Sequence, residues 1–127
     1  MKIEVSNGEI FDKLSILKIK TERIRDEDRL LEVKKEHGHL LLLSKEIDFS
    51  LNSDEYKRLC EINEALWDIE EEIRYKETEQ VYDEDFIQLS RNIYILNDER
   101  FRVKNAINLK TSSNFKEQKN HDTCYNI

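Results

Sequence analysis

The sequence DEDFIQLSRNIYILNDERFRVKNAINL, residues 83–109, repeats apolar side chains at intervals of three and four positions. That spacing is typical of one side of an α-helix, and a stretch without proline or glycine predicts a single helix about 40 Å long. The apolar positions on this side are Phe86, Leu89, Ile93, Leu96, Val103 and Ile107. Arg100 stands among them, where a charge is costly unless it is paired.

The rest of the chain also favours helices. It has 127 residues with no proline and two glycines, so few positions suit tight β-turns. Hydrophobic residues make up 38% of the chain and charged residues 39%. This composition predicts one charged, all-α domain that is large enough to bury a core without disulfides.

The cysteines and the lengths of the apolar runs bear on compartment and cofactors. Cys60 and Cys124 lack the spacing of a metal site or of a disulfide framework, and we expect two reduced thiols. No apolar run approaches the roughly 20 residues that span a bilayer, and the N-terminus has no signal-peptide pattern. We therefore expect a cytoplasmic protein that binds no membrane and carries no metal or other cofactor.

Charge is distributed unevenly along the chain. Residues 1–99 carry 15 Lys or Arg and 26 Asp or Glu, whereas residues 100–127 carry six and two. An acidic body argues against nucleic-acid binding, which needs a broad basic face. An acidic body with a basic end is compatible with contact between two copies of the chain, or with a local anion site.

An N-terminal helix is predicted to begin after Ser6. Ser6 and Glu9 have the spacing of a capping box, and they follow a short extended arm over residues 1–5 in which apolar residues alternate with charged ones. The main apolar stripe of this helix contains Ile10, Leu14, Leu17, Thr21 and Ile24, with Phe11, Ile16 and Ile19 beside it. A helix that is apolar on more than one side is either central in a bundle or covered by a second subunit.

A second helix is expected over about residues 27–47. The spacing breaks after Ile24, which predicts a turn near residues 25–28 with Asp26 as a cap; a bent continuous helix is the alternative. Residues 40–43 are four consecutive leucines, which cannot all face one core. Another element or another chain should therefore cover some of them.

A third helix is predicted from the capping pair Asn52 and Glu55 to about Thr78. Its apolar stripe consists of Leu59, Ile62, Leu66, Ile69 and Ile73. Residues 82–85 form a polar connection to the long helix. We interpret residues 1–110 as one up-and-down bundle domain of three or four helices, and residues 111–127 as a loosely held polar C-terminal tail. Surplus apolar surface on the first two helices favours a homodimer.

Polar side chains lie on the flanks of three of these apolar stripes. If the flanks face one another, nine residues converge: Lys13, Lys20, Asn63, Trp67, Glu70, Arg74, Asn97, Arg100 and Lys104. One interpretation is a satisfied internal network in which Glu70 pairs with Arg100. The alternative is a site for a phosphate or carboxylate with Trp67 or Tyr94 as an apolar wall. It follows from the charges on the inner flanks, where Glu70 faces four cations unless Glu9 or Asp12 joins it: Lys13, Lys20, Arg100 and Lys104.

Acidic residues on the outer sides are expected to face solvent. The third helix has four that point away from its apolar stripe, namely Glu61, Glu64, Asp68 and Glu71. A metal site in a bundle core needs carboxylates on the inner side, so this direction argues against a Mg²⁺ site. Asp98 and Glu99 are expected to point outward in the same way.

Three separated motifs carry a resemblance to a known family. They are SNGEIFDKLSILKIKTERI at residues 6–24, INEALWDIEEEIRYKE at 62–77 and NIYILNDERFRVKNAINL at 92–109. In this order they resemble a small all-helical family of bacteria and their phages, catalogued only as a conserved domain of unknown function. The resemblance implies a single-domain cytoplasmic helical protein with no assigned reaction or cofactor. Its relatives are sometimes encoded beside genes for surface-polysaccharide synthesis, which implies a sugar-nucleotide or glycan context.

The sequence favours a homodimeric helical protein that engages another protein or a small anion. No serine, cysteine or histidine has the spacing of a nucleophile and its base, and the two glycines form no phosphate-binding loop. No catalytic constellation is therefore evident. The alternative is an enzyme or sensor whose inner Lys and Arg side chains bind a phosphorylated or carboxylated metabolite, with a sugar nucleotide as one option.

Overall fold

The structure is a computed structural model that describes residues 1–120. Within them the chain forms four helices and no strands: α1 (Asn7–Arg23), α2 (Glu27–Ser44), α3 (Asp54–Thr78) and α4 (Glu84–Lys110). The predicted all-α class is confirmed, and the last helix is the longest, with 27 residues. None of the four helices in this part of the chain is both long enough and apolar enough to cross a membrane. Cys124 lies outside the described residues.

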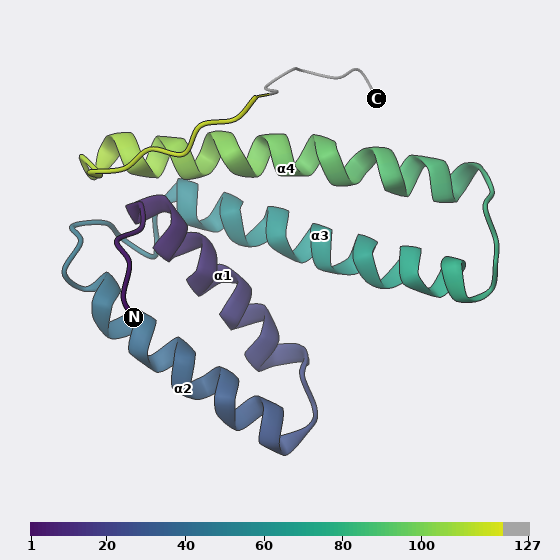
Figure 1. Cartoon of the computed structure of the whole chain (residues 1–127), viewed down its shortest axis with the longest axis horizontal. Helices are drawn as coiled ribbons and strands as arrows, with labels where there is room; N and C mark the ends of the chain where they lie inside the picture. Colours follow the sequence, from purple (N-terminus) through teal and green to yellow (C-terminus); the bar gives the residue numbers. More distant parts are fainter. Residues whose placement is uncertain (121–127) are drawn as a thin grey trace.

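The four helices form two hairpins that cross at one end (Figure 1). α3 and α4 lie side by side, and α2 lies beside α1. α1 packs against all three other helices, whereas α2 packs against α1 alone. The helices therefore do not run alongside one another as in the predicted up-and-down bundle. α1 is the central helix, and the two hairpins diverge from the crossing.

Each helix begins at a polar cap whose side chain accepts a hydrogen bond from the backbone three residues later. The caps are Ser6, Asp26, Ser53 and Asp83. Asp26 confirms the predicted turn between the first two helices, because Ile24 is extended and a new helix then begins without a proline or glycine. The prediction of Asn52 as the third cap is wrong by one residue, since the hydroxyl of Ser53 accepts this hydrogen bond.

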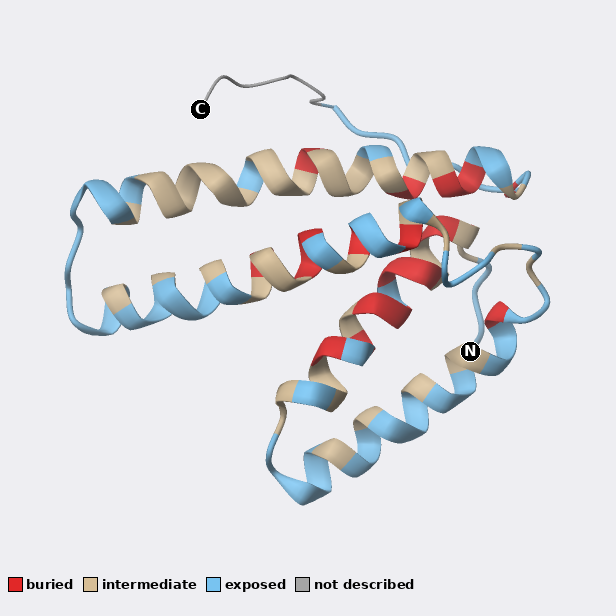
Figure 2. Cartoon of the chain, turned by 180° about the vertical axis from the view of Figure 1, so that it is seen from behind, coloured by how far each residue is buried: buried red, intermediate tan, exposed pale blue. Residues whose placement is uncertain are grey.

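The apolar core lies where α1 crosses α3 and α4 (Figure 2). Its fully enclosed side chains include Phe11, Leu14, Leu59, Ile62 and Ile107. Phe11 packs edge-on against Phe49 from the α2–α3 connection, with ring centroids 4.7 Å apart. The sequence placed Phe11 beside the main stripe of its helix, yet Phe11 is completely buried. A helix with neighbours on three sides has no single inner stripe.

Away from the crossing, α3 and α4 continue as a two-helix hairpin (Figure 1, Figure 2). No residue of α3 after Leu66 is buried, and no residue of α4 before Asp98 is buried. The predicted stripe residues Ile69, Ile73 and Ile93 are therefore only partly covered. A pair of helices cannot enclose a side chain from all sides, which a third packed element would do.

Residues 111–120, here termed the C-terminal segment, turn back along α4 (Figure 1). Ser112 has a left-handed conformation, with φ 52°, at the reversal. The hydroxyl of the buried Ser113 accepts a hydrogen bond of 3.0 Å from the backbone N–H of Asn7, and Asn114 donates one of 2.9 Å to Glu4. Residues 111–120 of the predicted loosely held tail therefore contact α4 and the start of α1, and residues 121–127 of that tail lie outside the described residues.

Candidate functional site

A buried ion pair between α1 and α4 lies at the centre of the polar residues. Arg100 Nε donates to Asp12 Oδ1 at 2.8 Å, and Nη2 donates to Oδ2 at 2.5 Å. Asp12 is completely buried, and 27% of the Arg100 side chain is exposed. The hydrogen bonds from Arg100 to Asp12 raise the pKa of the guanidinium above its ordinary value. Arg100 is therefore held as a cation against α1.

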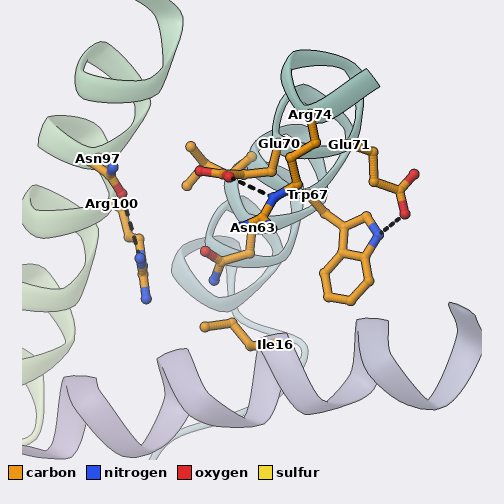
Figure 3. A pocket seen from close by; sticks show the side chains of 9 residues that line it. Ile16, Asn63, Trp67, Glu70, Glu71, Arg74, Asn97 and Arg100 are labelled. Carbon is orange, nitrogen blue, oxygen red and sulfur yellow. Dashed lines mark hydrogen bonds and ion pairs between the residues drawn. The ribbon is translucent and has the colours of Figure 1, made fainter. Parts of the chain in front are cut away.

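Glu70, the predicted partner of Arg100, does not pair with it. Its carboxylate lies 3.7 Å from Nε of Arg74, one turn further along α3, and about half of its side chain is exposed. Figure 3 shows Glu70 and Arg74 together, apart from Arg100. The prediction is wrong because α1 crosses at this level and brings its own carboxylate, Asp12, against α4.

Asp12 is also bound by an amide from α3. Asn63 Nδ2 donates to Asp12 Oδ1 at 3.0 Å and to Ser15 Oγ at 2.7 Å. Ser15 Oγ in turn donates to the backbone oxygen of Asp12 at 2.7 Å. Within residues 1–120, every buried side-chain nitrogen or oxygen has a hydrogen-bond partner. The network joins three helices and satisfies the requirement that a buried charge be paired and hydrogen-bonded.

Lys104 is a buried cation, one turn after the half-buried Arg100 on α4. Its Nζ lies 2.8 Å from Glu9, 2.9 Å from Glu117 and 4.0 Å from Asp12. Burial lowers the pKa of Lys104, but the hydrogen bonds to Glu9 and Glu117 outweigh this effect and leave the pKa raised. Glu9 and Asp12 thus balance the inner positive charge that one interpretation of the sequence left unpaired.

Both acidic residues of the NDER motif, residues 97–100, make ion pairs. Asp98 is only 5% exposed and pairs with Lys119 of the C-terminal segment. Glu99 accepts two hydrogen bonds of 2.7 Å from Arg58 of α3. The prediction that Asp98 faces solvent is wrong because the C-terminal segment covers that side of α4. The periodicity of a helix does not show whether a segment from elsewhere in the chain covers one of its sides.

Two hollows flank Arg100. The larger hollow, about 560 Å³, lies between α1, α3 and α4, with Ile16, Leu66 and Trp67 as its apolar lining (Figure 3). Its polar lining consists of Asn63, Glu70, Glu71, Arg74, Asn97 and Arg100. The smaller hollow, about 340 Å³, lies between α4 and the C-terminal segment and is lined by Asn97, Arg100, Phe101, Lys104, Glu117 and Lys119. Asn97 and Arg100 therefore border both hollows.

The structure brings most of the predicted polar residues to these hollows. Lys13 and Lys20 are the exceptions: Lys13 is exposed and lines a shallow surface beside the N-terminal arm, and Lys20 lines neither hollow. Sequence reasoning did not include Asp98, Glu117 or Lys119, and it named Asp12 only as an alternative. The signal for Asp12 was an acid inside an apolar helix, between Phe11 and Leu14.

The serine and cysteine side chains that could act as nucleophiles are either engaged in hydrogen bonds or lie away from the two hollows. The Ser15 hydroxyl is buried and donates to the backbone, and burial raises the pKa of the Cys60 thiol, which lines neither hollow. Among residues 1–120, no three His, Cys, Asp or Glu side chains are placed to hold a metal ion. The groups of the larger hollow that suit a ligand are the fixed guanidinium of Arg100, the amide of Asn97, the carbonyl oxygen of Asn63 and the indole of Trp67.

The whole chain matches one protein family. Residues 1–127 match DUF6165, which is described as a family of unknown function. The chain belongs to this family. A search of curated proteins and a search of solved structures each found no match. The three motifs that carried the resemblance hold the side chains that meet at the site, among them Asp12, Asn63, Trp67, Asn97 and Arg100.

Asp12→Asn in this DUF6165 protein should lower the free energy of unfolding by about 3–5 kcal/mol, because it removes the buried counter-charge of Arg100. Glu70→Gln is the matched control. It removes a carboxylate from an exposed pair and should change the free energy of unfolding by less than about 1 kcal/mol. Urea unfolding followed by circular dichroism measures both values. A larger loss for Glu70→Gln than for Asp12→Asn would restore Glu70 as the partner of Arg100.

Proposed function

We propose that this protein binds a small metabolite in the larger hollow, through a phosphate or carboxylate group of that metabolite. The observation that carries the proposal is how the Arg100 guanidinium is held. Asp12 binds Nε and Nη2, whereas Nη1 makes only a 3.5 Å contact with Asn97 Oδ1 among the described residues. A guanidinium that is fixed on one edge, and has further donors beside a hollow, suits an oxygen acceptor.

The lining of the larger hollow favours a ligand with a flat or ring-shaped body. Trp67 and Leu66 from α3 and Ile16 from α1 form an apolar surface (Figure 3). Asn97 offers its amide group, whereas Asn63 offers only its carbonyl oxygen because its Nδ2 already donates to Asp12 and Ser15. The indole Nε1 of Trp67 donates a hydrogen bond of 2.9 Å to Glu71, which orients the ring. A hollow of about 560 Å³ with a few polar groups among apolar ones has the size and character of a small-molecule site.

The charge balance limits the ligand to one negative group. Asp12 neutralises Arg100, Glu70 lies 3.7 Å from Arg74, and Glu71 adds a further acid to the lining, so within residues 1–120 the larger hollow has no surplus of cations. A polyanion would find too few counter-charges, whereas a single carboxylate or phosphate ester can share Arg100 with Asp12. Ring carboxylates and sugar monophosphates therefore fit this hollow better than sugar nucleotides do.

A thermal-shift screen tests the proposal. The compounds are ring monocarboxylates, sugar monophosphates and sugar nucleotides, each compared with its neutral parent. A ligand at 100 times its dissociation constant should raise the free energy of unfolding by about 2.7 kcal/mol. Asn97→Ala and Trp67→Leu should abolish the shift, because both side chains line the larger hollow. The proposal fails if no acidic compound shifts the wild type more than its parent does, or if both variants retain the shift.

Lys13→Met is the matched control for this screen. Lys13 is an exposed cation on α1 that lines neither hollow. Its loss should leave the ligand-induced shift unchanged, because it removes positive charge without touching the site. A loss of the shift in Lys13→Met would mean that overall charge, and not the larger hollow, accounts for binding.

A second function, that of a homodimeric interaction protein, is favoured by the outer side of α2. α2 packs against α1 alone, and Ser44 is its only buried residue. Leu31 and Leu42 are 68% and 65% exposed, and helical spacing places Gly38 on the same side. A Cβ at Gly38 would have no neighbour within 4 Å. An exposed leucine face around a glycine suits close packing against a helix of a second copy.

Sedimentation equilibrium tests the homodimer. The wild type should be a dimer at micromolar concentrations, and Leu42→Glu should be a monomer with an unchanged circular dichroism spectrum, because a charge replaces an apolar contact. Leu109→Glu is the control, since Leu109 is equally exposed, at 66%, but lies at the end of α4. A monomeric wild type, or a dimer that tolerates Leu42→Glu, would contradict this second function.

A further inference from the structure

The smaller hollow contains more positive than negative side chains. Arg100 and Lys104 of α4 line it together with Lys119 of the C-terminal segment, and Glu117 is the single acid that residues 1–120 contribute to its lining. Lys119 is held in place from two sides, by its pairing with Asp98 and by the Phe101 ring, whose centroid lies 5.6 Å from Nζ. Arg100, Lys104 and Lys119 thus share this hollow with Glu117, whose carboxylate lies 2.9 Å from the Lys104 ammonium.

Each of these cations already has an acidic partner that comes from the helices and lies outside the lining. The three pairs are Arg100–Asp12, Lys104–Glu9 and Lys119–Asp98. Glu117 is a fourth acid, 2.9 Å from Lys104, added to a cluster that is balanced without it. Its carboxylate therefore occupies a place that another single anion could take without changing the charge of the cluster.

Glu117 is also an acid that can leave its place at little cost. Its side chain is 44% exposed, whereas that of Asp12 is 1% exposed. Glu117 belongs to a segment with no helix of its own, so rotation of its side chain into solvent breaks no helical hydrogen bond. Asp12 could not leave in this way, because Arg100 and Asn63 bind it inside the crossing.

We infer that the smaller hollow is a subsite for one phosphate or carboxylate, and that Glu117 is a built-in occupant which such an anion displaces. The anion would take over the hydrogen bond of Lys104 and gain the ammonium group of Lys119. The inference rests on the proposed function in one respect: Arg100 borders both hollows, so an anion here would lie beside a ligand in the larger hollow.

Calorimetric titration with inorganic phosphate tests the inference. Glu117→Gln should bind phosphate about tenfold more tightly than the wild type, because a charge-assisted hydrogen bond to Lys104 no longer competes. Lys119→Met, introduced into Glu117→Gln, should reverse this gain. Glu55→Gln is the matched control: it breaks an ion pair with Lys110 away from both hollows and should leave the phosphate affinity unchanged.

The outcomes separate this inference from the proposed function. If Glu117→Gln binds phosphate no more tightly than the wild type, the inference is overturned. Trp67 lines only the larger hollow, so tighter binding that persists when Trp67→Leu is added supports the smaller hollow. Loss of that binding with Trp67→Leu overturns the inference and leaves the proposed function standing. A failed metabolite screen beside a positive phosphate result overturns the proposed function alone.

Discussion

The packing of the helices depends on a carboxylate that is completely buried. Asp12 is enclosed where α1 crosses α3 and α4, and its charge is tolerated because Arg100 and Asn63 bind its oxygens. Since these partners come from α4 and α3, they set the position of α1 against both helices. Gly8 reinforces this position one turn earlier, because a Cβ there would lie 2.4 Å from the backbone oxygen of Lys104.

The same ion pair prepares the proposed site for a ligand. Arg100 is immobilised by Asp12 before any ligand arrives, so binding need not order this long side chain. Arg100 and Asn97 border both hollows, which places the aromatic wall of Trp67 on one side and the Lys104 ammonium on the other. In the proposed function, a ligand rests its ring against Trp67 and directs its acid group toward Arg100. In that proposal, the buried Asp12 carboxylate serves ligand binding because it holds the Arg100 guanidinium in place.

Helical periodicity was sufficient to predict the helices, but not to predict which helices and segments pack against one another. The break between α1 and α2 was predictable because the loss of phase after Ile24 and the cap at Asp26 coincide. Asp12 could not be chosen over Glu70, because periodicity gives the direction of a side chain on its own helix and not which helix lies opposite. The burial of Asp98 depends on residues 111–120, whose composition indicates only a polar end.

A double-mutant cycle measures how far the fold depends on the Asp12–Arg100 pair. The free energy of unfolding is determined for the wild type, Asp12→Asn, Arg100→Met and the double variant. The two side chains bind each other directly, so the double variant should lose less stability than the two single losses combined, with a coupling energy of about 1–3 kcal/mol. Losses that add to within about 0.5 kcal/mol would show that the two residues act independently and would contradict this account.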